Sequence, residues 1–211
     1  MPNPPQDSLD LHLHAMVQAI VTVLAVINPV VSGSIFLRLT PELKPAERRR
    51  AAVKAALGIL AILIGSALIG LKVLNIFGVS LDVFRIVGGM IVAYMGFDML
   101  RGRQTVGQAS PADDDAPAAS LGPLIMFAAG PGTITAVVTL AAVHTPDGLP
   151  VTALVAAAVG AAVTCTVLLL AARIGTRLVE NTQALVTRFM GLIVASMGMQ
   201  FVLTGLKAFF G

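Results

Sequence analysis

Six runs of about twenty apolar residues limit what this chain can fold into. An α-helix rises about 1.5 Å per residue, so each run can cross the ~30 Å hydrocarbon layer of a bilayer. Inside lipid every backbone amide needs a protein partner, which leaves helices and closed barrels. The runs lack the polar–apolar alternation of barrel strands. We therefore predict an all-α polytopic membrane protein with spans at 16–36, 51–73, 83–100, 124–143, 151–174 and 189–210.

The positive charges are unevenly distributed. Eleven of the 14 Lys and Arg residues fall in the connections 38–54, 101–120 and 173–188. Cytoplasmic loops carry such an excess, so these connections are predicted to face the cytoplasm of an inner (plasma) membrane, with both termini outside. The run Arg48-Arg49-Arg50 is interpreted as an anchor at lipid headgroups, and no nucleic-acid partner is expected.

The connection after the first span carries a helix-start pattern. Thr40 followed by Pro41 resembles an N-cap with proline at the first helical position. This pattern predicts a brief juxtamembrane helix that carries the basic residues from Lys44 to Arg50.

The sequence repeats itself at a constant offset of 102 residues. The offset aligns two proline-containing breaks, two pairs of glycines and a hexamer that is identical at five of six positions. The aligned pairs are Asn28-Pro29 with Gly130-Pro131, Gly58 with Gly160, Gly89 with Gly191, and 91–96 with 193–198. In a membrane chain, matching helix breakers in two halves indicate the binding site of a transporter.

Each repeat contains three spans, so the second must enter the membrane from the side opposite to the first. The prediction is two inverted three-helix repeats with broken first and fourth helices. The expected units are an outer tail at 1–14, the first repeat at 15–100, a solvated cytoplasmic linker at 101–120 and the second repeat at 121–211. The tail lacks the basic start and the cleavage site of a signal peptide.

The first predicted break lies well inside an apolar span. Pro29 removes a backbone donor and clashes with the carbonyl four residues earlier, so Asn28-Pro29 is expected to interrupt the helix. Ser32 and Gly33 add polar groups and backbone freedom at a depth where protein or water must satisfy them. Taken alone, this break fits either a binding site or a packing kink at a helix contact.

The second predicted break strengthens the binding-site interpretation. Gly130-Pro131-Gly132 followed by Thr133 and Thr135 is typical of a helix end and a new helix start, whose free amides favour a carboxylate. Two facing breaks could hold a small zwitterion, with amides on its carboxylate and with carbonyls and Asn28 on its ammonium group. The predicted substrate-binding residues are Asn28, Pro29, Ser32, Gly33, Gly130, Pro131, Gly132, Thr133 and Thr135.

Asp98 is the carboxylate expected within a span, and it is the candidate ligand for a coupling Na⁺ or H⁺. The alternative is an ion pair with Arg101, one helical turn away. Arg85 and Arg188 lie at the starts of their spans, where they are expected to be membrane anchors.

The remaining reactive residues have simpler interpretations. A mean hydropathy of +0.89 excludes an ordinary soluble domain, and the sequence contains no HExxH motif, P-loop or triad around its histidines. Cys165 is expected to be a small buried side chain. Asp113-Asp114-Asp115 in the linker and His144 beside Asp147 in an outer turn are not expected to bind metal. No enzymatic activity, cofactor or metal is predicted.

Three segments resemble the MarC family of small integral membrane proteins: INPVVSGSIFLRLTPELKPAERRRAA, FRIVGGMIVAYMGFDML and AAGPGTITAVVTLA. The resemblance runs from about residue 16 to residue 210. It implies membership of the lysine-exporter-like transporters, in which some proteins are similar to cation-coupled transporters of glycine and alanine. Family members typically continue the first break with a Gly and a later Pro. Val31 and Ser34 stand at those places here, so the first break is expected to differ in shape.

These patterns together predict a secondary transporter of small neutral amino acids that works by alternating access around a midplane site. The expected partners are a small zwitterionic substrate, Na⁺ or H⁺, and membrane lipid. The alternatives are an exporter of another small metabolite, an ion-conducting pore, and a non-transporting membrane scaffold. The sequence leaves open the direction of transport and the formation of a homo-oligomer.

Overall fold

The computed structural model describes residues 4–102, 121–144, 148–174 and 180–211, and within them the side chains of 13–102, 121–143, 148–173 and 187–211. The regular structure in these ranges is helical, as expected for an all-α membrane protein. The helices are α1 (Pro4–Ile27), α2 (Pro29–Leu39), α3 (Pro45–Ile76), α4 (Leu81–Leu100), α5 (Gly122–Ala128), α6 (Pro131–His144), α7 (Val151–Ile174) and α8 (Glu180–Phe210).

The long apolar helices coincide with the predicted spans. Five stretches of the described residues are long and apolar enough to cross a membrane, and α5 with α6 forms a sixth if this pair, bent by 41°, is counted as one span. One of the five runs from Leu13 to Leu39 and contains both α1 and α2. Helix α3 extends several residues beyond both ends of the predicted 51–73.

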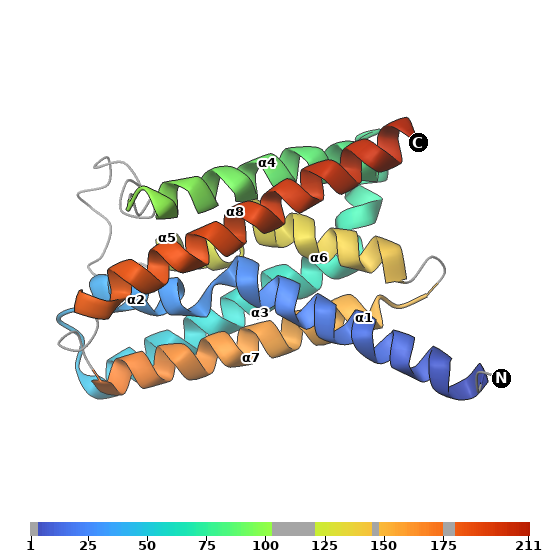
Figure 1. Cartoon of the computed structure of the whole chain (residues 1–211). Helices are drawn as coiled ribbons and strands as arrows, with labels where there is room; N and C mark the ends of the chain where they lie inside the picture. The colour runs from blue at the N-terminus through green and yellow to red at the C-terminus, as the bar shows by residue number, and fades with distance from the viewer. Residues whose placement is uncertain (1–3, 103–120, 145–147, 175–179) are drawn as a thin grey trace.

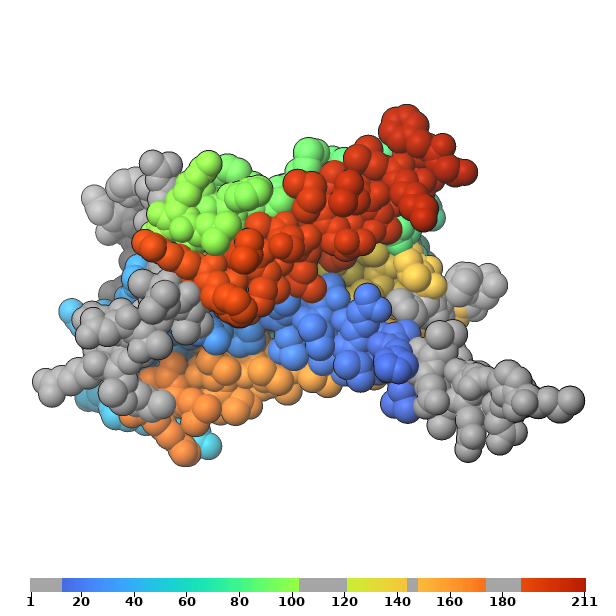
Figure 2. All heavy atoms as spheres, viewed as in Figure 1, coloured from blue at the N-terminus to red at the C-terminus, as the bar shows by residue number. Residues whose placement is uncertain are grey.

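The helices run roughly along one long axis of the molecule, and both termini lie at the same end (Figure 1). Helix α8 lies along α4, and these two helices form the most extensive helix contact of the described residues. Helix α3 packs against α7. Helix α1 packs against α7 and α6. On the face shown in Figure 2, α1 is visible between α8 and α7.

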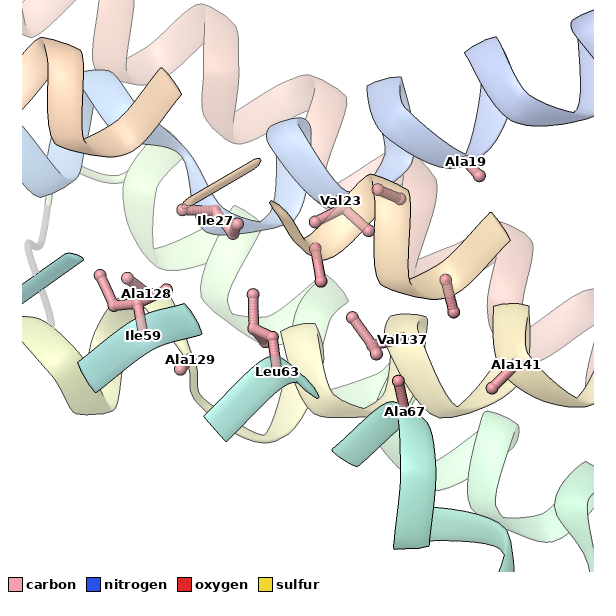
Figure 3. Close-up of a cluster of buried hydrophobic side chains, with 13 residues drawn as sticks. Ala19, Val23, Ile27, Ile59, Leu63, Ala67, Ala128, Ala129, Val137 and Ala141 are labelled. Atoms are coloured by element: carbon pink, nitrogen blue, oxygen red, sulfur yellow. The ribbon is translucent and has the colours of Figure 1, made fainter. Parts of the chain in front are cut away.

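The main core joins α1, α3, α6 and α7 through small side chains (Figure 3). Val23 and Ile27 of α1 and Leu63 of α3 are fully buried among residues that are mostly alanines. Because lipid offers little hydrophobic driving force between helices, such small residues favour association through close van der Waals contact. By contrast, large apolar side chains such as Leu57, Ile69 and Leu203 are more than half exposed, as a lipid-facing surface requires.

Helices α4 and α8 approach each other at glycines. A methyl group placed on Gly89 would lie 2.6 Å from the carbonyl oxygen of Gly198, and one on Gly191 would lie 2.9 Å from that of Gly96. Only glycine leaves room for the facing backbone at these distances. The two contacts are related by the 102-residue offset found in the sequence.

A second pair of contacts follows the same offset. A methyl group on Gly58 of α3 would lie 3.0 Å from Ile125 Cδ1, and one on Gly160 of α7 would lie 3.0 Å from Val23 Cγ1. Gly160 lies 102 residues after Gly58, and Ile125 lies 102 residues after Val23. The offset therefore relates tertiary contacts as well as residue types.

The predicted helix start at Thr40-Pro41 is wrong, because α3 begins at Pro45. Thr40 is instead the C-cap of α2, and its Oγ1 donates 2.8 Å to the Phe36 carbonyl. Arg48 contributes to the same turn, since its Nη2 donates 2.7 Å to the Thr40 carbonyl. Arg48 therefore ties the end of α2 to the start of α3.

Candidate functional site

The first break is a single left-handed residue between two helices. Asn28 has φ 48° and ψ 73° and separates Ile27, the last residue of α1, from Pro29, the first of α2. A residue before proline is driven out of the right-handed helical region, and asparagine is one of the few residues that tolerate the left-handed one. The local sequence thus accounts for both the position and the shape of this break.

Most polar groups of the first break are satisfied locally. Asn28 Oδ1 accepts 3.3 Å from the Val31 amide, and Ser32 Oγ donates 3.1 Å to the Ile27 carbonyl. Asn28 is only 1% exposed, yet its Nδ2 has no hydrogen-bond partner among the described residues. An unsatisfied donor at such depth is costly and needs an explanation. Since only oxygen can accept from Val31, the free atom of this amide is the donor.

The second break is wider than the first. Helix α5 ends at Ala128 and α6 begins at Pro131, with Gly130 between them. A methyl group on Gly130 would lie 2.5 Å from the Met126 carbonyl oxygen, so a side chain at this position would collide with the last turn of α5. Thr135 Oγ1 donates 2.9 Å to the Pro131 carbonyl within the first turn of α6.

The two breaks approach each other through α1 and α6. A methyl group on Gly132 would lie 3.6 Å from Val26 Cγ1, two residues before Asn28, and would also contact Val92 of α4. Thr133 is 1% exposed, and Thr135, 2% exposed, packs on Gly88 of α4. The first turn of α6 therefore lies against the end of α1.

Other residues of the predicted set face elsewhere. Gly33 lies against α7, where a methyl group on it would stand 3.3 Å from Val167 Cγ1. Pro131 is exposed, and Pro29 is half-buried. Asp98 is 4% exposed and has an interaction partner. It lies six residues after Val92, or about 9 Å farther along α4.

Arg85 differs most from the sequence-based expectation. A membrane anchor is exposed, but Arg85 is only 8% exposed. Its Nη1 lies 3.5 Å from Asp82 Oδ1, and its Nε is buried without a hydrogen-bond partner among the described residues. The anchor prediction is therefore wrong for Arg85. The sequence did not show this burial because the residues that bury Arg85 come from distant parts of the chain.

Arg85 lines a cavity of about 350 Å³ that lies among α1, α4, α6 and α8. Sequence reasoning missed this cavity, although the charged pair Asp82 and Arg85 at the start of an apolar span was a local signal of it. Its lining residues are Ala15, Gln18, Ala19, Thr22, Arg85, Thr139, Leu140, Val143, Gln200, Phe201 and Thr204.

Several sequence-based expectations fall outside the described residues. They are the linker from 103 onward with Asp113-Asp114-Asp115, and the turn after His144 with Asp147. Within the described ranges, no group of three or more His, Cys, Asp or Glu side chains is placed to hold a metal ion.

Similarity to known proteins shows which family the chain belongs to. A profile described as MarC family integral membrane protein matches residues 13–210. The chain belongs to the MarC family. This MarC protein is 32% identical over 192 residues to a UPF0056 membrane protein of Pyrococcus abyssi, covering 89% of this chain and 92% of that one. It is 31% identical over 201 residues to the UPF0056 inner membrane protein MarC of Salmonella typhimurium, covering 88% and 91%.

A UPF0056 membrane protein of Methanocaldococcus jannaschii is 30% identical over 204 residues, covering 93% of this chain and 98% of that one. No solved structure matches this MarC protein. The names of these relatives describe membrane proteins, one of them of the inner membrane, and mention no enzymatic reaction. With its long apolar helices, the chain is a multi-pass integral membrane protein.

Proposed function

We propose that this MarC protein is a secondary transporter of small neutral amino acids such as glycine and alanine. The observation that carries the proposal is the pair of helix breaks at one offset, which meet through α1 and α6. Broken helices at equivalent places of two repeats are how many transporters build a midplane site. The unsatisfied Nδ2 of Asn28 supports a polar ligand at this place.

The breaks offer partners for both ends of a zwitterion. The free amides at the start of α6 and the Nδ2 of Asn28 are donors suited to a carboxylate. Carbonyls at the ends of α1 and α5 suit an ammonium group, since the last carbonyls of a helix lack intrahelical partners. Asn28 thus takes a different role from the one the sequence predicted, because Val31 already occupies its oxygen.

Two inverted repeats, at 15–100 and 121–211, are part of the same proposal. The paired contacts of Gly58 with Ile125 and of Gly160 with Val23 support a pseudo-twofold relation between them. Counting α5 and α6 as one span gives six spans, with both termini on the same side, as in Figure 1. The basic connections then assign that side to the outside of the inner membrane. Movement of one repeat against the other would expose the breaks alternately.

The proposal is tested by uptake into proteoliposomes that contain the purified protein. Labelled glycine and alanine should accumulate when an inward Na⁺ or H⁺ gradient is imposed, and unlabelled alanine should compete. Absence of gradient-dependent uptake and of exchange for every neutral amino acid would contradict transport of this class. A current that persists without substrate would favour a pore instead.

Asp98 is proposed as the ligand of the coupling cation. If this is correct, Asp98→Asn should abolish accumulation against a gradient and leave exchange of internal for external alanine largely intact. Loss of both activities, with the protein still folded, would instead assign Asp98 to the common transport cycle. Unchanged accumulation would exclude it from coupling.

A further inference from the structure

The cavity beside Arg85 is separate from the two helix breaks. It lies toward the end of the molecule where the termini are found, between the middle of α1 and the second half of α8. Its volume of about 350 Å³ is within the range of small-molecule sites. Six of its lining side chains are polar: Gln18, Thr22, Arg85, Thr139, Gln200 and Thr204.

Arg85 gives this cavity a positive charge that its ion-pair partner, Asp82, balances only weakly. The 3.5 Å separation from Asp82 is longer than the ~2.7–2.9 Å of a strong charge-assisted hydrogen bond. A guanidinium carries five N–H donors, and Nε of Arg85 has no partner among the described residues. Burial of a cation with donors to spare is unfavourable unless an anion completes the site.

Thr139 is a second, independent observation at the same cavity. It comes from α6, is 9% exposed, and its Oγ1 is buried without a hydrogen-bond partner in the described part of the chain. Several Thr and Ser hydroxyls in the described helices donate to the carbonyl four residues earlier, as Thr164 does to Gly160 at 2.7 Å. The hydroxyl of Thr139 remains available to a ligand.

We propose that this cavity binds the carboxylate of a small amino acid at the outer end of the transport path. The planar fork of Arg85 matches the two oxygens of a carboxylate, and the Thr139 hydroxyl is a further donor. The side-chain oxygens of Gln18, Gln200 or Thr204 can accept from the ammonium group. The choice of an amino acid rests on the proposed transport function, whereas the choice of a carboxylate rests on the cavity itself.

The test measures equilibrium binding of labelled alanine to the purified full-length protein. Propionate, which is alanine without its amine, should compete, and ethylamine, which lacks the carboxylate, should compete far less. Arg85→Gln should weaken binding of propionate by at least about tenfold, since it removes a charged hydrogen-bond partner. The matched control is Lys207→Gln, an exposed cation in the last turn of α8, which should leave affinity unchanged.

The outcomes separate this inference from the proposed function. Unchanged propionate affinity in Arg85→Gln, or equal competition by chloride, would overturn the carboxylate site even if transport is observed. Propionate binding that depends on Arg85 in a protein that transports no amino acid would support the site and contradict the transport proposal. The two failures are therefore distinguishable.

Two milder variants keep the test valid if Arg85→Gln does not fold. Arg85→Lys keeps the charge without the fork, and Thr139→Val keeps the shape without the hydroxyl. Each should weaken propionate binding about threefold or more. Wild-type affinity in both variants would overturn the proposal.

Discussion

Asn28 uses the two ends of one side-chain amide for different purposes. Its oxygen caps α2 through Val31, while its nitrogen stays buried without a partner in the described part of the chain. The left-handed backbone at φ 48° holds the amide in this orientation. The proposed transport function gives the free nitrogen a role in ligand binding, and a substitution must separate that role from the cap.

Asn28→Gly makes that separation. Glycine adopts the left-handed conformation freely and costs less than about 1 kcal/mol as an N-cap replacement, so the protein should remain folded. Uptake of alanine should fall by at least about tenfold because the free donor is gone. Thermal unfolding in detergent checks the first expectation and proteoliposome uptake the second.

Asn28→Ala is the matched comparison. It loses the same amide and also places a β-carbon at positive φ, so it should be less stable than Asn28→Gly by about 1–2 kcal/mol. Normal uptake by Asn28→Gly would show that the free nitrogen has no part in transport.

At the scale of the elements, the break before α6 can be altered without steric conflict. Pro131 is exposed, whereas a methyl group on Gly132 would collide with Val92. Replacement of both residues would therefore mix loss of the break with overpacking. Pro131 is the residue to change alone.

Pro131→Ala restores a backbone donor between α5 and α6, which favours a continuous helix. Alanine uptake should fall by at least about tenfold while the unfolding temperature changes little. Pro45→Ala is the matched control, since Pro45 also begins a helix but lies in an exposed connection. Equal uptake by the two variants would argue against the break as a moving part of the transport cycle.

The α4–α8 contact depends on backbone approach. A methyl group on Gly96 would meet the backbone of Ala195 and lie 2.7 Å from the Gly191 carbonyl oxygen. Gly96→Ala should therefore destabilise the protein by about 1–3 kcal/mol through overpacking. Gly65→Ala in α3 is the control, because no described atom lies within 4 Å of its added methyl group. Circular dichroism melting should show a lower midpoint for Gly96→Ala only.

The sequence could predict these breaks because proline acts on its immediate neighbours. It could not predict which atom of Asn28 stays free, since that depends on the left-handed φ and on Val31. The helix start predicted at Thr40-Pro41 was wrong because Thr40 ends α2 and its hydroxyl bonds backward to Phe36. The pair of Asp82 and Arg85 was a local signal of the cavity, but the burial of Arg85 depends on distant residues, since Gln18, Thr139 and Gln200 line the cavity from three other helices.

At the scale of the whole molecule, the two halves do not make identical contacts. The 102-residue offset pairs α4 with α8 and α6 with α2. Helix α4 packs against α6, yet among the described residues α8 makes at most slight contact with α2. In an alternating-access protein the two repeats exchange such arrangements, so we expect the opposite state to pack α8 on α2 and to loosen α4 from α6.

The orientation of the molecule is tested by labelling from outside the cell. In a background with Cys165→Ala, single cysteines are placed at Gly211 and at Arg49, both of which are exposed. A membrane-impermeant maleimide should label Gly211→Cys in intact cells, and Arg49→Cys only after permeabilisation. The reverse pattern would place the termini in the cytoplasm.

The buried charge of Arg85 also sets an order of events at the cavity that it lines. A cation about 4 Å from the guanidinium meets a repulsion of about 4 kcal/mol at the effective dielectric of a protein surface, which Asp82 only partly offsets. A carboxylate that arrives first removes this repulsion. Entry from this end should therefore be sequential, with the amino acid bound before its coupling ion.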